Sequence, residues 1–134
     1  MGYSLFTGGV IDDVTDERWI IFSRALPPSG KSAVPLDFLE NRSPGIWLLS
    51  GSENEKDPGY ILGLFNWNCA DSTEISLDFT KLGLDSDKQY IAFSFWDQRL
   101  IPGFHNGMNI NLSTSGCMIL NIREKTVNPG CTWV

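Results

Sequence analysis

The residues able to perform acid–base, nucleophilic or metal chemistry are few and scattered in this chain. The single histidine, His105, lies in the glycine-rich segment 103–107, where a solvated loop residue is expected. Cys69, Cys117 and Cys131 are odd in number and lack the CxxC spacing of zinc and redox sites, so we expect reduced, mostly structural thiols without a shared disulfide. We therefore predict no catalytic residue, no metal site and no cofactor.

A pair of carboxylates could serve as general acid and general base. The acidic residues of this chain, however, stand where a helix cap, a turn or a solvent-facing strand position accounts for them. Those considered are Asp12, Asp13, Asp16, Glu17, Asp78 and Asp97.

Aromatic side chains offer a different chemistry, because exposed rings can stack on sugars. Trp96, Phe104 and Trp133 are the candidates for such a role. An aromatic stripe belongs more often to a core than to a binding platform, so the sequence assigns no carbohydrate-binding residue.

Composition and charge exclude several kinds of partner. The chain has 134 residues, 42% of them hydrophobic, which suits one packed domain and not a disordered segment. The formal net charge of −6 and the scattered Lys and Arg argue against nucleic acid and against an anionic membrane. The apolar runs are too short to span a bilayer. The first residues lack a basic segment followed by a sustained apolar one, so we expect no signal peptide. Nothing indicates a particular compartment.

Short strand patterns separated by turn signals fill the chain from residue 45 onward. They cover segments 45–49, 60–67, 74–79, 90–97, 100–103, 108–112 and 117–123. Ile75, Leu77 and Phe79 alternate with polar residues and are predicted to be buried. Asn106-Gly107 predicts a tight hairpin between its flanking strands. The predicted fold class is mainly β, an antiparallel β-sandwich of about seven or eight strands with one N-terminal helix.

The N-terminal region has a different pattern. A helix is predicted from Thr15 to Leu26, with Thr15 as its N-cap and Pro27 ending it. Trp19, Phe22 and Leu26 fall on one face. Because so short a helix is marginal alone, its apolar face would be buried against the sandwich, against a second copy of the chain, or not at all. Of these we favour a homodimer formed through this helix.

Together these segments resemble the C-terminal β-sandwich of α-galactosidase-like (melibiase-type) glycoside hydrolases. The blocks that carry the resemblance are Trp47-Leu-Leu49, Leu62-Gly-Leu-Phe-Asn-Trp67, Leu77-Asp-Phe79 with Leu82-Gly-Leu84, the segment 90–97 and Cys117-Met-Ile-Leu-Asn-Ile122. Upstream, Gly8-Gly9, Asp12-Asp13, Ala25-Leu-Pro-Pro28 and Pro35-Leu-Asp37 resemble the last βα unit of a barrel and the linker leaving it. The tail 128–134 departs from the family, because it does not resemble a closing strand.

The resemblance implies two regions, with residues 1–34 a remnant of the last barrel βα unit and linker, and 35–134 the sandwich domain. It also implies a catalytic (β/α)8 barrel as partner. The two catalytic carboxylates would lie on earlier barrel strands, so none carries over to this chain.

The favoured function is therefore a non-catalytic module that stabilises or flanks the barrel of an enzyme acting on α-galactosides. The alternatives are a carbohydrate-binding module and, least favoured, a complete small enzyme.

Overall fold

The computed structural model describes residues 14–25, 30–51 and 59–125. The chain divides into two compact units, Met1–Ser32 and Ala33–Val134. The assignment of residues 1–34 to a barrel remnant and of 35–134 to the sandwich domain of a glycosidase stays a prediction.

The first unit contains one helix, α1 (Asp16–Ala25), as the sequence predicts. The amide of Trp19 donates to the carbonyl oxygen of Thr15 at 3.0 Å, which places Thr15 at the N-cap. Asp16 and Glu17 occupy the first turn, where negative charge is favourable at the positive end of the helix dipole. Trp19 and Ile20 are about half exposed. The Phe22 side chain and Leu26 lie outside the described residues.

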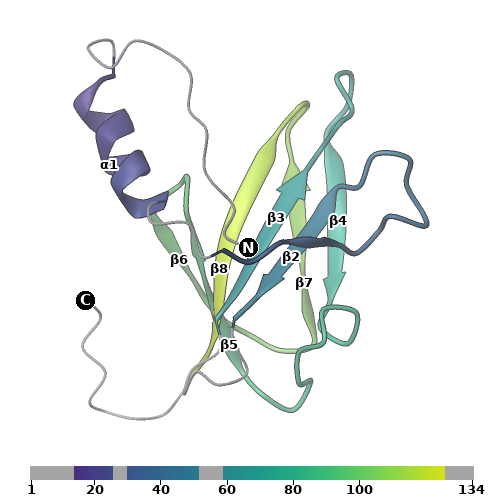
Figure 1. Cartoon of the computed structure of the whole chain (residues 1–134). Helices are drawn as coiled ribbons and strands as arrows, with labels where there is room; N and C mark the ends of the chain where they lie inside the picture. Colours follow the sequence, from purple (N-terminus) through teal and green to yellow (C-terminus); the bar gives the residue numbers. More distant parts are fainter. Residues whose placement is uncertain (1–13, 26–29, 52–58, 126–134) are drawn as a thin grey trace. The chain divides into compact units, whose positions relative to one another are not determined.

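The second unit consists of antiparallel strands in two sheets of unequal size (Figure 1). The strands are β1 (Val34–Pro35), β2 (Ile46–Ser50), β3 (Tyr60–Phe65), β4 (Thr73–Asp78), β5 (Tyr90–Ser94), β6 (Arg99–Phe104), β7 (Gly107–Leu112) and β8 (Cys117–Glu124). Six of them form one sheet in the order β1-β2-β3-β8-β5-β6, and β4 pairs with β7 in the other. The predicted mainly β fold with one helix is confirmed.

The core lies between the two sheets. From the large sheet, Leu62 and Leu64 of β3 and Leu120 and Ile122 of β8 are fully buried. From the small sheet, the apolar positions of β4 and β7 face them, and Phe79 fills the space beyond the end of β4. The predicted alternation in 75–79 is confirmed, because the apolar residues point inward while the polar ones are exposed.

The two sheets are joined by the buried side chain of Asn66, directly after β3. Its amide nitrogen donates to the carbonyl oxygens of Asp71 and Ser113, each at 2.9 Å, near the start of β4 and the end of β7. Its Oδ1 accepts hydrogen bonds from Asn68 N and from Thr73 Oγ1. One side chain thus fixes where the small sheet begins and ends relative to the large one.

Two local predictions are wrong. Asn106-Gly107 is not a hairpin turn, because β6 pairs with β5 and β7 pairs with β4, so the segment crosses between sheets. Its left-handed backbone is still required, since Asn106 has φ 62° and Gly107 φ 152°, and a Cβ on Gly107 would collide with the Leu77 carbonyl oxygen. The strand expected over 90–97 ends at Ser94, where a four-residue turn leads into β6.

The core register can be tested on β4. Leu77→Ala should lower the free energy of unfolding by roughly 2 to 4 kcal/mol, because Leu77 is 4% exposed and the truncation leaves a cavity. Ser76→Ala, on the exposed side of the same strand, is the control and should change it by less than about 0.5 kcal/mol. Urea unfolding of both variants measures the difference, and equal losses would contradict the register.

Candidate functional site

Of the three aromatic residues proposed as a sugar platform, the two that the structure describes, Trp96 and Phe104, do not come together. Trp96 is 47% exposed, in the turn before β6, and packs edge to face on Phe95. Phe104 ends β6, and its ring contacts Phe79 in the core at 5.3 Å between centroids. Trp96 and Phe104 therefore lie at opposite ends of β6, which is about 17 Å long as an extended strand. Trp133 lies outside the described residues.

The remaining reactive groups that the structure describes do not form a centre either. Cys69 and Cys117 are free, and both are exposed, whereas mostly structural thiols were expected; Cys131 lies outside the described residues. His105 is exposed. Within residues 14–25, 30–51 and 59–125, no three His, Cys, Asp or Glu side chains gather closely enough to hold a metal ion. No helix in the same residues is long and apolar enough to cross a membrane.

The acidic candidates serve local structure where they are described. Asp78 Oδ1 accepts hydrogen bonds from the backbone nitrogen and hydroxyl of Thr80, which shape the turn after β4 and lower the pKa of Asp78. Asp97 Oδ2 accepts a hydrogen bond from the buried hydroxyl of Ser94 in the turn after β5. Asp12 and Asp13 lie outside the described residues.

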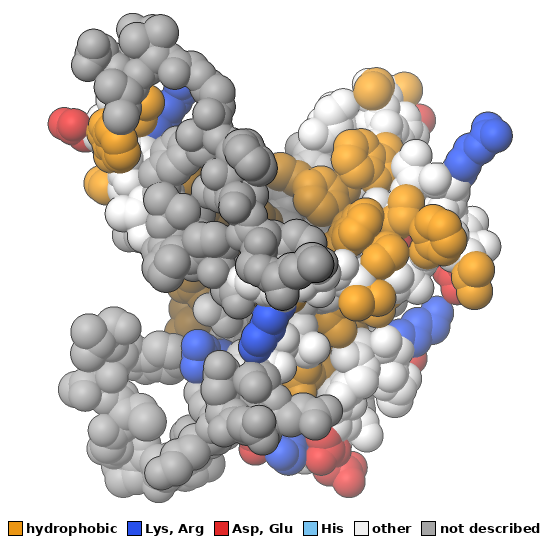
Figure 2. All heavy atoms as spheres, in the orientation of Figure 1, with side chains coloured by type: hydrophobic (Ala, Val, Ile, Leu, Met, Phe, Trp, Pro, Cys, Tyr) orange, Lys and Arg blue, Asp and Glu red, His pale blue; other side chains and the backbone are white. Residues whose placement is uncertain are grey.

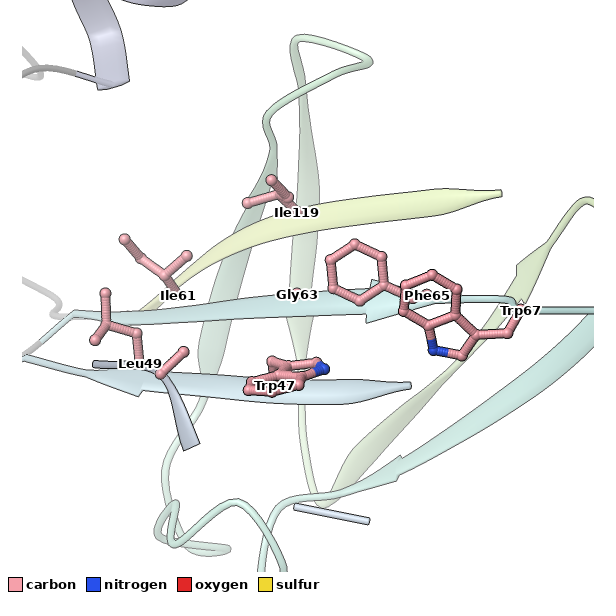
Figure 3. Close-up of a pocket in the computed structure, with 8 residues that line it drawn as sticks. Trp47, Leu49, Ile61, Gly63, Phe65, Trp67 and Ile119 are labelled. Atoms are coloured by element: carbon pink, nitrogen blue, oxygen red, sulfur yellow. The ribbon is translucent and has the colours of Figure 1, made fainter. Parts of the chain in front are cut away.

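A pronounced surface feature lies on the outer face of the large sheet, the face turned away from the small sheet. Figure 2 shows hydrophobic side chains gathered on the near face, where Figure 1 places β2 and β3. They form a hollow of about 420 Å³, here called the outer trough. Its lining residues are Ala33, Trp47, Leu49, Ile61, Gly63, Phe65, Trp67 and Ile119 (Figure 3). None of these residues carries a charge.

Strand register explains how the outer trough forms. Trp47 of β2, Gly63 of β3 and Ile119 of β8 are cross-strand partners, so they lie in one row on one face. Ile61 and Phe65 are two residues away from Gly63 along β3 and therefore share this face. Because Gly63 has no side chain, the middle of the row is low and its four neighbours form the walls.

One end of the trough is shaped by two indoles that share an acceptor. Nε1 of Trp47 and Nε1 of Trp67 both donate to the carbonyl oxygen of Pro44, at 3.0 and 2.9 Å. The rings of Phe65 and Trp67 are stacked, with centroids 5.4 Å apart and 14° between their planes. Trp67 nevertheless remains 59% exposed. The position of the aromatic wall thus depends on where the Pro44 carbonyl points.

The Pro44 carbonyl is positioned by a buried carboxylate. Asp37 Oδ2 accepts hydrogen bonds from Asn41 Nδ2 and from the Gly45 amide, and Oδ1 accepts one from the Ile46 amide. Burial alone raises the pKa of Asp37, but these hydrogen bonds together outweigh burial and hold the pKa below its ordinary value. The loop that enters β2 is therefore fastened on both sides of Pro44.

The chemistry available in the trough is apolar contact. Both indole N–H groups are already donated to Pro44, and the lining backbone of β2 and β3 is engaged in the sheet ladder. A sugar ring needs partners for its hydroxyl groups as well as a stacking surface, and this face offers mainly the latter. It is better suited to an apolar protein surface.

Comparison with known proteins adds information about the fold. No protein-family profile matches the chain, and no curated protein sequence matches it significantly. A GH27 β-L-arabinopyranosidase from Geobacillus stearothermophilus, solved in complex with arabinose, matches 72% of this chain with a TM-score of 0.52 and 14% identity. The two share a fold. Alpha-galactosidase I from Mortierella vinacea matches 58% of the chain with a TM-score of 0.45 and 17% identity.

In both comparisons the match spans 20% of the other enzyme's chain. The fold shared with the GH27 arabinopyranosidase confirms the predicted resemblance at the level of the fold alone, for a segment much shorter than that enzyme.

The trough residues were not singled out by sequence reasoning, although a signal existed. β3 has the sequence Tyr-Ile-Leu-Gly-Leu-Phe, without the apolar–polar alternation seen in β4. An unbroken apolar strand is typical of a sheet that is covered on both faces. The absence of alternation therefore indicated a second contact surface.

Asp37 should make stability depend on pH. Because its folded-state pKa lies below the unfolded value of about 3.9, its contribution is complete above that value and is lost as pH falls through the folded-state pKa. Asp37→Asn leaves one backbone amide facing an NH2 group. The substitution should therefore lower the free energy of unfolding by about 1 to 3 kcal/mol at pH 7. The variant should also lose less stability between pH 5 and pH 2 than the wild type.

Urea unfolding at several pH values measures both effects. Asp71→Asn removes the same charge from an exposed residue and is the control. A wild type and Asp37→Asn variant with parallel pH profiles would contradict the role given to this carboxylate.

Proposed function

We propose that this chain is the non-catalytic β-sandwich module of an α-galactosidase-like glycoside hydrolase, which docks on a catalytic (β/α)8 barrel and stabilises it. Activity on α-galactosides belongs to the barrel in this proposal. The fold shared with a GH27 enzyme, over one fifth of that enzyme's chain, supports the family and the need for a much larger partner.

The observation that carries the proposal is the outer trough. The large sheet is apolar on both faces over β2 and β3, and its inner face is covered by β4 and β7. Its outer face bears half-buried and exposed apolar residues around Gly63, among them Ile61 at 43% and Trp67 at 59% exposure. Contiguous apolar surface of this kind marks an interface, and uncharged apolar patches are typical of permanent ones.

The energetic gain from covering this face is substantial. Burying a large apolar side chain completely contributes roughly 1.5 to 3 kcal/mol. Several trough residues are partly exposed, so a partner that covers them would add a useful share of a typical domain stability of about 5 to 15 kcal/mol. The module and the barrel would then stabilise each other without any residue of the module touching substrate.

The alternative, a carbohydrate-binding module using exposed aromatics, has weaker support. Trp96 and Phe104 are separated, and the exposed Trp67 has its indole N–H engaged with Pro44. A sugar bound to Trp67 would have stacking without the side-chain hydrogen bonds that fix orientation.

We also infer that α1 supports self-association, because Trp19 and Ile20 are about half exposed on a helix too short to be stable alone. Sedimentation of the intact chain should then show a dimer. Replacing both residues with Ser should raise the dissociation constant of this dimer by at least about tenfold. Arg18→Ser with Ser23→Ala, two exposed polar positions on α1, is the control. A monomeric wild type at high concentration would contradict this inference.

The docking proposal is tested by one substitution in two settings. Where the genomic reading frame upstream of Met1 encodes barrel strands, Ile61→Glu is made both in the isolated chain and in the joined protein. In the joined protein a buried charge should lower the temperature of half-inactivation on an aryl α-galactoside by roughly 4 to 8 °C, with little change in KM. In the isolated chain the same substitution should lower thermal stability much less, because the Ile61 side chain already contacts water there.

Two controls complete the experiment. Ser76 lies on the exposed side of the small sheet, so Ser76→Glu should change the thermal stability of neither protein. The isolated chain should not hydrolyse the substrate. Turnover by the isolated chain that a substitution in it abolishes, or equal losses from Ile61→Glu in both settings, would contradict the proposal.

A further inference from the structure

A second hollow lies between the edges of the two sheets. β6 and β7 run from the corner at His105 and Asn106 into different sheets, where they pair with β5 and β4 and not with each other. The space between these two strands is a hollow of about 360 Å³, here called the edge crevice. Its volume falls within the range of about 300 to 1,000 Å³ that is typical of small-molecule sites.

The floor of the edge crevice is apolar. Ile101 of β6, Met108 and Ile110 of β7 and Met118 of β8 line it. Ile110 belongs to the core, and the other three pack against the core while remaining half-buried. Because methionine side chains are flexible and polarisable, this floor can adapt to the shape of an apolar ligand.

The rim of the edge crevice carries three planar polar side chains, Arg99 of β6 and Asn109 and Asn111 of β7. Arg99 is the cross-strand partner of the buried Ser94, so its side chain leaves β6 on the inner face of the large sheet. Within residues 14–25, 30–51 and 59–125, none of the three rim side chains has a hydrogen bond or an ion pair. The rim therefore keeps its hydrogen-bonding groups available, unlike the indole donors of the outer trough.

The charge of the rim indicates the kind of ligand. Arg99 is the one charged residue among those lining the edge crevice, and no carboxylate lines it. The acidic residue closest to Arg99 in sequence, Asp97, accepts a hydrogen bond from the hydroxyl of Ser94. A guanidinium group donates two parallel hydrogen bonds to a carboxylate, and the amides of Asn109 and Asn111 can donate to the same oxygens. One positive charge balances one negative charge, so the head group that fits is a single carboxylate.

We propose that the edge crevice binds a small monocarboxylate with an apolar body, such as a medium-chain fatty acid. The carboxylate is held by Arg99 at the rim, and the apolar body lies on Met108 and Met118. This site is independent of docking on a barrel, because the edge crevice and the outer trough share no lining residue.

Methionine methyl groups provide a local reporter of binding. Two of the three methionines of the chain line the edge crevice, so the full chain is isotope-labelled at its methionine methyl groups and titrated with octanoate. The methyl signals of Met108 and Met118 should shift with a Kd of about 1 mM or tighter, which is within reach of a ligand of this size. Labelled methyl groups of Ile61 and Ile119 report on the outer trough in the same sample.

Two further probes separate the head group from the body. Acetate has the carboxylate without the chain, and octanol has the chain without the charge. Each should bind at least about tenfold more weakly than octanoate, because each lacks one of the two contacts.

A substitution at the rim tests the role of the charge. Arg99→Gln should raise the Kd of octanoate by at least about tenfold and leave the Kd of octanol unchanged, because octanol has no charge to lose. Arg42→Gln removes the same charge from an exposed residue outside the edge crevice and should change neither value. Circular dichroism should show that both variants melt close to the wild type, since both side chains are exposed.

Three results would overturn the proposal. Octanoate that shifts the methyl signals of Ile61 and Ile119 but not those of the two methionines would place the ligand in the outer trough. An unchanged Kd of octanoate in Arg99→Gln would show that the carboxylate is not held at the rim. Galactose that shifts the methionine signals at lower concentration than octanoate would make the edge crevice a site for a neutral sugar.

Discussion

The structure depends on one imbalance: the large sheet is apolar on both faces over β2 and β3, but only its inner face is covered, by the two strands of the small sheet. β4 and β7 supply the residues that close the core against Leu62, Leu64, Leu120 and Ile122. The outer face around Gly63 carries side chains of the same apolar kind and remains partly in water. Apolar area buried on one face stabilises the sandwich, and apolar area left on the other favours association by the same hydrophobic effect.

Polar groups hold the apolar surfaces in shape. Asn66 uses its amide and its carbonyl oxygen to join the end of β3 to both strands of the small sheet. Asp37 fastens the loop before β2, and through the Pro44 carbonyl this loop orients the indoles of Trp47 and Trp67. Every buried side-chain nitrogen and oxygen among the described residues has a hydrogen-bond partner. A surface held in this way loses little conformational entropy on docking, which favours a tight complex.

The fold class could be predicted from sequence because most of its information is local. Alternation in β4, turn residues between strands and the cap at Thr15 each act within a few positions. The trough could not be assembled in this way, since its row Trp47–Gly63–Ile119 joins strands that are distant in the chain. The same reason explains the error at Asn106-Gly107. Its local turn preference is real, but pairing of β4 with β7 and of β5 with β6 decides where the chain goes.

A sandwich fold by itself is compatible with catalysis, sugar binding and structural support, so function has to be argued from the surface. A sugar site needs hydrogen-bonding groups directed at the ligand, whereas the indole donors of this face are directed inward at Pro44. A docking face needs apolar area and a shape that a partner can fill, and the outer trough offers both. Gly63 contributes to that shape, because a Cβ in its place would lie 3.3 Å from Cε2 of Phe65 and fill the centre of the trough.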